Sequence, residues 1–384
     1  MTRAQTHRRR GRAAVLLLSL FLLTASLLPT PVLGANPVIR GVVVQDGLVN
    51  PWDVAFLPGG QMVVTERPGR VRIFASGLPN ASLLGTTTLI SVRAEGESGV
   101  MGVAVDHLFR TNRLIYVCAS RMYGGQWVNQ VIRFKVNTNW TLTQNKYLIA
   151  TGIRANTIHN GCAVEEGPDQ RIWVSTGEAN NPMLAQNPSS LNGKILRINR
   201  DGSVPADNPI MPGTSKRTFV YSMGHRNPQG IAFMPSPARV YAVEHGPERD
   251  DEINWIRPGR NYGWPCRTGY NHFYRSCSGV IGSFTNPVWT SGATTIATSG
   301  AAIVNGTVWQ DVSRQLFVAT LKQSDLRRFS IASVGLPATY RQTYFNNIWG
   351  RLRAVVNGPA GTTLYLTTSN GSNDKIIRVI PRSS

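Results

Sequence analysis

Short apolar segments separated by turns recur along the whole chain. Each segment follows a turn, runs or alternates apolar for about six residues, and carries an aromatic or β-branched residue near its centre. Such segments are typical of β-strands, and their recurrence at long intervals is typical of a repeat protein. There are six of them, at residues 60–65, 113–118, 170–175, 239–244, 315–320 and 363–368.

Weaker apolar strands follow several of these segments, for example at residues 71–74, 131–136, 195–199 and 376–380. The intervals exceed the roughly 40–45 residues of a minimal four-stranded blade, so each leaves room for four strands and long loops. The pattern therefore predicts an all-β fold, a six-bladed β-propeller that forms a single domain over residues 35–384. A sandwich or two stacked barrels is the alternative, but neither explains a sixfold strand-turn repeat.

A leader is expected at residues 1–34. Five arginines precede an apolar run over residues 13–28, and residues 32–34 form a small-residue cleavage signal, as in a secretory signal peptide. A single membrane anchor is the alternative, but the run is short for a span of ~20 residues. We therefore expect a secreted or periplasmic protein with no stable membrane insertion after the leader is cleaved.

The charge balance changes this picture little. The chain has 40 Lys and Arg residues against 20 Asp and Glu residues, a formal net charge of +20. Beyond the leader the basic residues are scattered, without the basic block or aromatic-interleaved basic helix that nucleic-acid binding uses, so we expect no nucleic-acid partner. With 42% apolar and only 16% charged residues, intrinsic disorder is excluded.

Four cysteines in an exported chain are expected to pair. Cys266 and Cys277 flank a short polar and aromatic loop and form the first expected disulfide. Cys118 and Cys162 belong to different repeats, so their pairing depends on the fold and stays open. None of the four has CxxC spacing, which argues against a structural zinc site or a redox dithiol.

Three polar segments carry more chemistry than a propeller core needs. His159 precedes the strand of the third repeat and Glu178 follows it, so the carboxylate could orient the imidazole as a general base. A structural, hydrogen-bonded histidine is the alternative. In the turn of residues 221–232, Arg226 and Asn227 could form a fork of donors for a carbonyl or carboxylate, or a buried arginine could tie blades together.

The third segment is acidic. Its carboxylates, together with turn carbonyls, are the ligands that calcium prefers, although the spacing is not that of an EF-hand. A solvated acidic turn is the alternative. The four acids are Glu248, Asp250, Asp251 and Glu252.

Together these segments resemble the soluble quinoprotein sugar dehydrogenases, the pyrroloquinoline quinone (PQQ) dependent glucose, aldose-sugar and sorbosone dehydrogenases. The resemblance covers nearly the whole chain after the leader, and the motifs occur in the same order as in the family. Its fold is the propeller that the repeats already predict. The motifs lie at residues 50–53, 65–67, 96–102, 159–162, 191–197, 224–230, 244–247, 251–254, 261–265 and 350–353.

The resemblance implies a PQQ molecule at the mouth of the channel with calcium beside it. His159 matches the family's general base, which takes the proton from the anomeric hydroxyl of an aldose while hydride passes to the quinone. Arg226 and Asn227 match the pair that contacts the quinone oxygens. His159, Glu178 and Arg226 are therefore the expected catalytic residues.

The resemblance also assigns the remaining cofactor and metal contacts. Cations at three positions match those that hold the cofactor's carboxylates, and Glu97 matches a further cofactor contact. The backbone carbonyls of Gly246 and Pro247 match the calcium ligands at the cofactor, while Glu252 and Tyr262 match a second calcium site found in part of the family. The three expected carboxylate-binding cations are Lys322, Arg351 and Arg353.

Three positions depart from the family pattern. Glu178 stands where the family usually has Asp, Ala354 replaces an Asp, and Cys162 replaces a Gly. None of these changes removes the base or a cofactor cation, so we expect an active enzyme.

Two rival functions are weaker. A non-catalytic propeller that binds a protein or a glycan, like the related hedgehog-interacting proteins, has no need for a cation cluster around the channel. A calcium-dependent propeller hydrolase would place its metal at the channel centre, whereas the acids here cluster in one loop. The sequence has no CxxCH haem segment, so we expect electrons to leave to a separate acceptor.

Overall fold

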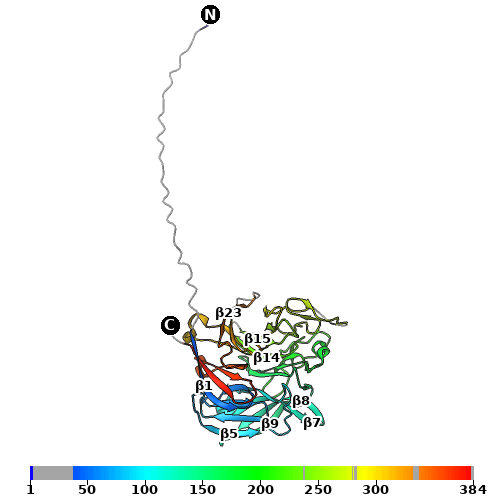
Figure 1. The fold of residues 1–384 in the computed structure, drawn as a ribbon. Helices are drawn as coiled ribbons and strands as arrows, with labels where there is room; N and C mark the ends of the chain where they lie inside the picture. The colour runs from blue at the N-terminus through cyan, green and yellow to red at the C-terminus, as the bar shows by residue number, and fades with distance from the viewer. Residues whose placement is uncertain (3–37, 237, 279, 281–282, 332–336, 382–384) are drawn as a thin grey trace. The chain divides into compact units, whose positions relative to one another are not determined.

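The structure is a computed structural model that describes residues 1–2, 38–236, 238–278, 280, 283–331 and 337–381. The chain divides into two compact units, Met1–Ala35 and Asn36–Ser384. Apart from Met1 and Thr2, the expected leader at residues 1–34 lies outside the described residues. The fold below is that of the second unit (Figure 1).

Six four-stranded antiparallel sheets build this unit, which confirms the predicted six-bladed β-propeller. The first three blades follow one another in chain order. They consist of β2 (Pro51–Phe56), β3 (Met62–Glu66), β4 (Arg70–Phe74) and β5 (Leu83–Thr88), then β6 (Val100–Val105), β7 (Leu114–Tyr123), β8 (Gln126–Val136) and β9 (Leu142–Ile149), then β10 (Gly161–Glu166), β11 (Ile172–Thr176), β12 (Lys194–Ile198) and β13 (Val220–Met223).

The sixth blade closes the ring with the two ends of the unit. Its outer strand, β1 (Ile39–Leu48), pairs antiparallel with β26 (Asp374–Pro381), so the blue N-terminal strand lies beside the red C-terminal ones in Figure 1. The last three blades consist of β14 (Pro228–Pro235), β15 (Ala238–Glu244), β16 (Glu252–Ile256) and β19 (Trp289–Thr290), then β20 (Thr298–Ile303), β21 (Leu316–Thr320), β22 (Leu326–Ser330) and β23 (Thr339–Tyr344), then β24 (Leu352–Asn357), β25 (Leu364–Thr368), β26 (Asp374–Pro381) and β1 (Ile39–Leu48).

The connections hold only short elements. No helix within the described ranges is long and apolar enough to cross a membrane. The short elements are α1 (Phe109–Asn112), the 3₁₀ turns η1 (Pro182–Gln186), η2 (Thr307–Val312) and η3 (Pro359–Gly361), and the small hairpin of β17 (Arg267–Thr268) and β18 (His272–Phe273).

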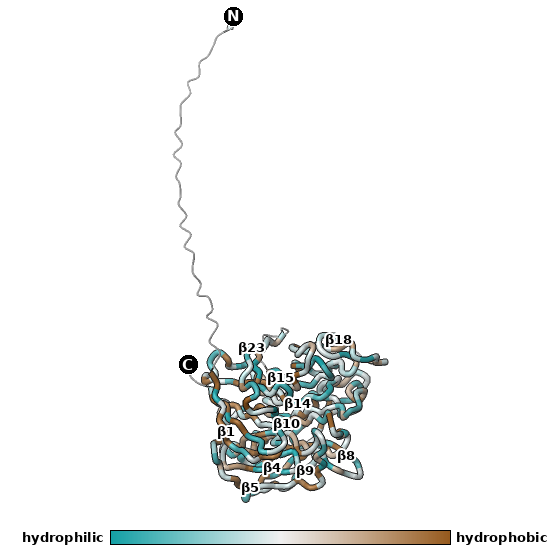
Figure 2. Tube along the Cα trace, viewed as in Figure 1, coloured by the Kyte–Doolittle hydropathy of each residue, from teal (hydrophilic) through white to brown (hydrophobic). Residues whose placement is uncertain are grey.

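The six predicted repeat segments are the second strands of the six blades: β3, β7, β11, β15, β21 and β25. The weaker predicted strands are third strands: β4, β8, β12 and β26. Second strands read as apolar runs because both of their faces are covered by neighbouring blades; every residue of β3, β11, β21 and β25 is buried. Figure 2 shows hydrophobic segments recurring along the blades.

The first strands of the blades, β2, β6, β10, β14, β20 and β24, contact one another in a closed ring around the channel. Because all six blades have the same strand order, these strands run in the same direction, and the turns that precede them meet at one end of the channel.

Both disulfides form. Cys266 pairs with Cys277, as predicted. Cys118 of β7 pairs with Cys162 of β10, with 5.7 Å between the Cα atoms, because the second and third blades pack against each other. The Cys162 departure from the family pattern therefore has a partner in Cys118.

Candidate active site

The expected catalytic residues meet in turns at one end of the channel. His159 lies in the turn before β10, and Glu178 follows β11 of the same blade. The Nδ1 atom of His159 hydrogen-bonds Glu178 Oε1. A carboxylate partner fixes the proton on Nδ1 and leaves Nε2 as the basic atom. Glu178 is buried, whereas the His159 side chain remains 13% exposed, so the imidazole can be reached by a ligand.

Close backbone packing holds these two turns together. The Ala179 N–H donates to the His159 carbonyl at 3.0 Å, and a Cβ atom at Gly177 would lie only 2.0 Å from the same oxygen. His159 itself adopts a left-handed φ of 57°, a strained conformation for a non-glycine residue. Glycine at 177 is therefore required for the imidazole to approach Glu178.

Glu97 and Asn227 tie the His159 turn to neighbouring blades. Glu97 Oε2 accepts the backbone N–H of His159 at 2.9 Å and the side-chain amide of Asn227 at 3.3 Å. The side-chain Oδ1 of Asn227 in turn accepts the Gly161 N–H at 3.0 Å. Both predicted residues are thus at the site, where their observed contacts position the His159 turn.

Arg226 lies next to these carboxylates. Its backbone N–H donates to Glu244 at 2.8 Å, and its guanidinium lies over the Trp264 ring at 5.2 Å. Burial lowers the pKa of Arg226, and the charges of Glu178 and Glu97 oppose that shift. Its Nε atom is buried without a hydrogen-bond partner among the described residues.

Arg353 forms a second cationic centre at the start of β24. Its guanidinium stacks on Trp52 at 3.8 Å, and it donates from Nη1 to Gln229 at 2.9 Å and from Nε to Ser369 at 3.2 Å. Burial lowers the pKa of Arg353 to about 10; the charge of Glu97 opposes this shift, while those of Arg351 and Arg67 add to it. Positive groups therefore crowd this end of the channel.

The other two predicted cations are exposed. The Arg351 side chain reaches solvent, although its charge is felt by Arg353. Lys322 donates from Nζ to Thr295 at 3.0 Å, and no contact within the described ranges joins it to His159, Arg226 or Arg353. Of the expected catalytic and cofactor-binding residues, the structure therefore brings together all except Lys322.

The loop with the expected calcium carbonyls is held by Asp251. This buried carboxylate accepts backbone N–H groups from Gly246 at 2.8 Å, Ile296 at 2.5 Å and Ala297 at 2.6 Å. Among the described residues no hydrogen bond reaches the carbonyl oxygens of Gly246 and Pro247. Two free carbonyls on a fixed loop are suitable ligands for a hard cation.

The expected second calcium site is less open. Glu252 accepts the Gly269 N–H at 2.7 Å and the Asn254 amide at 2.9 Å, and burial together with the charge of Glu244 raises its pKa well above the usual range. The Tyr262 hydroxyl donates to the Trp255 carbonyl, so only the backbone oxygen of Tyr262 is left as a metal ligand.

The acidic segment is not a solvated turn. Asp250, Asp251 and Glu252 are buried, and only Glu248 is exposed. That alternative interpretation is wrong for three of the four acids, because the acids act as internal hydrogen-bond acceptors.

Sequence reasoning missed two site residues. Arg67 donates to the Gly96 carbonyl beside Glu97 and contributes to the low pKa of Arg353. His245 has a lowered pKa, first from burial and also from the charges of Arg226 and Arg353, and its Nε2 is buried without a partner among the described residues. Both lie within motifs quoted for the resemblance, so an additional basic residue inside a motif was the available signal.

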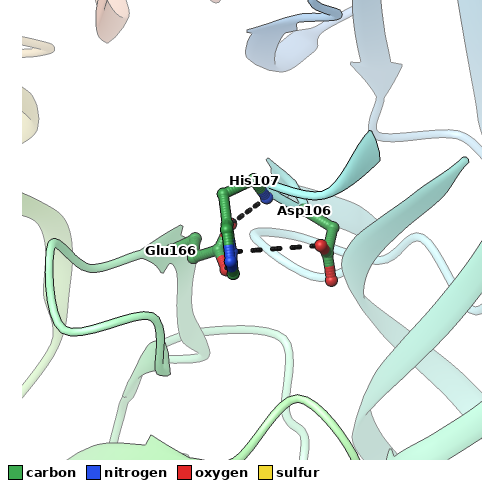
Figure 3. Close-up of side chains that lie close together, drawn as sticks. All are labelled: Asp106, His107 and Glu166. Atoms are coloured by element: carbon green, nitrogen blue, oxygen red, sulfur yellow. Dashed lines mark hydrogen bonds and ion pairs between the residues drawn. The ribbon is translucent and has the colours of Figure 1, made fainter. Parts of the chain in front are cut away.

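Asp106, His107 and Glu166 form another histidine–carboxylate cluster (Figure 3). His107 Nδ1 lies 2.6 Å from Glu166, but Asp106 is already paired with Arg200 at 3.1 Å and accepts from Tyr116. Because its acids are satisfied by protein donors, this cluster is a structural network.

Comparisons with known proteins identify the family of this chain. Residues 48–378 match the Glucose / Sorbosone dehydrogenase family. The chain is 29% identical to an aldose sugar dehydrogenase of Escherichia coli over 95% of this chain and 99% of that protein. It is 30% identical to quinoprotein glucose dehydrogenase B of Acinetobacter calcoaceticus over 59% of this chain and 52% of that protein.

Solved structures are similar as well. The PQQ-bound aldose sugar dehydrogenase of Streptomyces coelicolor superposes with a TM-score of 0.74 at 29% identity, covering 90% of this chain and all of that one. The apo-form of the soluble aldose sugar dehydrogenase of Escherichia coli gives a TM-score of 0.78 at 29% identity, with 90% and 100% coverage. The chain therefore belongs to the Glucose / Sorbosone dehydrogenase family.

Proposed function

We propose that this protein is a PQQ-dependent sugar dehydrogenase that oxidises the anomeric hydroxyl of an aldose, with His159 as the general base. The observation that carries the proposal is the partly exposed His159–Glu178 pair beside a cluster of buried cations. Family membership and the PQQ-bound relative from Streptomyces coelicolor support it.

The residues present suit an anionic quinone. Buried nitrogen atoms of Arg226, Arg67 and His245 have no partner among the described residues, and burial, with the charges of Arg351 and Arg67 adding to it, lowers the pKa of Arg353. An anion with several carboxylates would satisfy both groups of atoms. Bound PQQ supplies the quinone that accepts hydride. The residues that would hold it are Glu97, Arg226, Asn227, Arg351 and Arg353, together with Lys322, which the resemblance alone assigns because it lies outside the contacts of this group.

The chain's own residues move and hold the proton. His159 Nε2 takes the proton of the sugar hydroxyl, because Glu178 keeps the other ring nitrogen protonated. The buried Glu178 carboxylate then stabilises the imidazolium. Arg226 lies close enough to feel the charge of Glu178, so its guanidinium is available to stabilise negative charge that develops next to His159.

Calcium would bind at the free carbonyls of Gly246 and Pro247, with a second ion at Glu252 and the Tyr262 carbonyl. Export through the leader at residues 1–34 agrees with the two disulfides, which persist in oxidising compartments. Electrons leave to a separate acceptor.

A panel of aldoses assayed with a dye acceptor, with and without PQQ and calcium, tests the proposal. We expect oxidation only when both are present. Sugar oxidation after dialysis against chelator and without PQQ would refute the cofactor. A PQQ-loaded protein that oxidises no aldose would favour a non-catalytic binding propeller.

A further inference from the structure

A lysine is fully buried at the end of the channel where the candidate active site lies. Lys194 is the first residue of β12, in the same blade as His159 and Glu178. Among the described residues no carboxylate pairs with it. Its Nζ atom donates instead to three backbone carbonyls, those of Leu184 at 2.8 Å, Ala185 at 3.1 Å and Asn192 at 2.7 Å. An ammonium group has three donors, so these contacts use all of them and offset the cost of burying the charge.

Two of the three carbonyls belong to η1, which lies against the turn of Arg226. The Ala185 carbonyl also accepts the Gly224 N–H at 3.0 Å, and the Gly193 carbonyl accepts the His225 N–H at 3.2 Å. A Cβ atom at Gly193 would lie only 2.7 Å from the His225 carbonyl oxygen and from the Cα of Ala185. The backbone turn that carries Arg226 is therefore packed directly against the segments that Lys194 holds.

The third carbonyl belongs to Asn192, whose side chain reaches the turn of Glu178. The Asn192 amide donates to the Gly177 carbonyl at 2.9 Å. Gly177 immediately precedes Glu178 and is packed against the His159 carbonyl. The Glu178 N–H in turn donates to the Arg226 carbonyl at 2.9 Å. Contacts that begin at one ammonium group therefore reach all three expected catalytic residues.

Arg197 offers a comparison within the same strand. It is buried as well, and its guanidinium pairs with Asp169 at 2.7 Å and with Asp207 at 2.8 Å. Asp169 lies in the turn between β10 and β11, at the opposite end of the blade from His159. Both cations tie loops to β12, but only Lys194 does so at the end with the candidate active site.

We infer that Lys194 is a positioning residue: its ammonium group fixes the turns that set Glu178 against His159 and that hold Arg226 beside this pair. The inference rests on the proposed function, in which His159 is the base. Without the ammonium group three buried carbonyls lose a donor, and the turns that they anchor can shift. A displacement of about 1 Å at reacting groups can cost about 10²-fold in rate.

Lys194→Met tests this role, with Arg197→Met as the matched control. Methionine keeps a long, unbranched side chain but donates no hydrogen bond. Burial lowers the pKa of Lys194 to about 7, so measurements at pH 6 keep the ammonium of the wild type charged. At saturating PQQ and calcium we expect Lys194→Met to lower turnover by about 10- to 100-fold, and Arg197→Met by less than about twofold. Equal turnover losses in the two variants would overturn the inference.

Proton NMR of the apo-protein gives a readout that needs neither PQQ nor turnover. An imidazole N–H that is bonded to a carboxylate resonates far downfield, because the hydrogen bond is charge-assisted. The resonance of the His159–Glu178 bond is identified as the one that His159→Ala removes. We expect Arg197→Met to keep this resonance, and Lys194→Met to shift it or to lose it through exchange with water. An unchanged resonance in Lys194→Met would contradict the inference even if turnover fell.

The two readouts separate this inference from the proposed function. A wild type that oxidises no aldose, but whose resonance depends on Lys194, would refute the proposed function and support the positioning of Glu178 against His159. If Lys194→Met does not fold, Lys194→Gln, which keeps amide donors, should show part of the turnover loss and a smaller shift of the resonance. Parent turnover and an unchanged resonance in Lys194→Gln would contradict the inference.

Discussion

Two histidine–carboxylate pairs flank Arg226, and they differ in how completely their atoms are used. His225 is fully buried; its Nδ1 bonds Glu244 at 2.8 Å and its Nε2 bonds Ser222 at 2.9 Å. His159 bonds Glu178 through Nδ1, keeps an exposed edge, and the second oxygen of Glu178 has no partner among the described residues. The contact between histidine and carboxylate is common to both pairs, so open bonding capacity is what distinguishes the proposed base, His159, from His225.

The largest expected effect is on turnover and concerns the pair with open bonding capacity, His159 and Glu178. His159→Ala should lower turnover by about 10²–10⁴-fold, the usual contribution of a general base, while PQQ affinity changes little because the cations are retained. Steady-state kinetics and a PQQ titration of one preparation measure both quantities. A variant that oxidises aldoses at the parent rate would show that His159 is not the base.

The fully bonded pair, His225 and Glu244, should affect the stability of the fold. His225→Ala removes a fully buried ring and leaves Glu244 without one of its partners, so unfolding free energy should fall by about 2–4 kcal/mol. Denaturant unfolding measures this, with His159→Ala as the matched control, for which we expect a smaller loss. A larger stability loss for His159→Ala than for His225→Ala would invert the comparison.

Replacing either arginine of β24 and its preceding turn should weaken the cofactor site without touching the base. Arg351→Ala and Arg353→Ala should each cost about 1–3 kcal/mol of PQQ binding, the range for a lost hydrogen bond to a charged group. We expect the larger loss for the buried Arg353. Unchanged affinity in both variants would mean that these side chains are structural.

The smallest effects test the support of His159. Glu178→Gln should reduce turnover by about tenfold, less than the loss of the imidazole itself, because the ring stays but its imidazolium is no longer stabilised. Glu178→Asp, which restores the family's usual residue, should retain most activity. If Glu178→Gln lowers turnover as much as His159→Ala does, Glu178 does more than support His159, and the proposed assignment of the base is wrong.

The fold was predictable because its signal is local. Four of the second strands are buried along their whole length and the other two over most of it, so their apolar runs stand out from the sequence. The Cys118–Cys162 bond could not be settled in this way, because it requires β7 and β10 to pack in neighbouring blades.

The site was predictable only where a motif fixed a residue's role. His159, Glu178, Arg226, Asn227 and Glu97 came from recognised motifs, and their contacts show them together. Lys194 also lies in a recognised motif, but its contacts had no sequence signal, because only the folded chain brings the carbonyl groups of η1 to its ammonium group.

Equilibrium binding of PQQ to the purified apo-protein with calcium tests the central claim most directly. We expect one PQQ per chain, seen as a bound quinone absorption band that is weakened by chelator and by Arg353→Ala. An absorption spectrum equal to the sum of free PQQ and protein, at concentrations well above micromolar and with calcium present, would contradict a quinone site at this end of the channel.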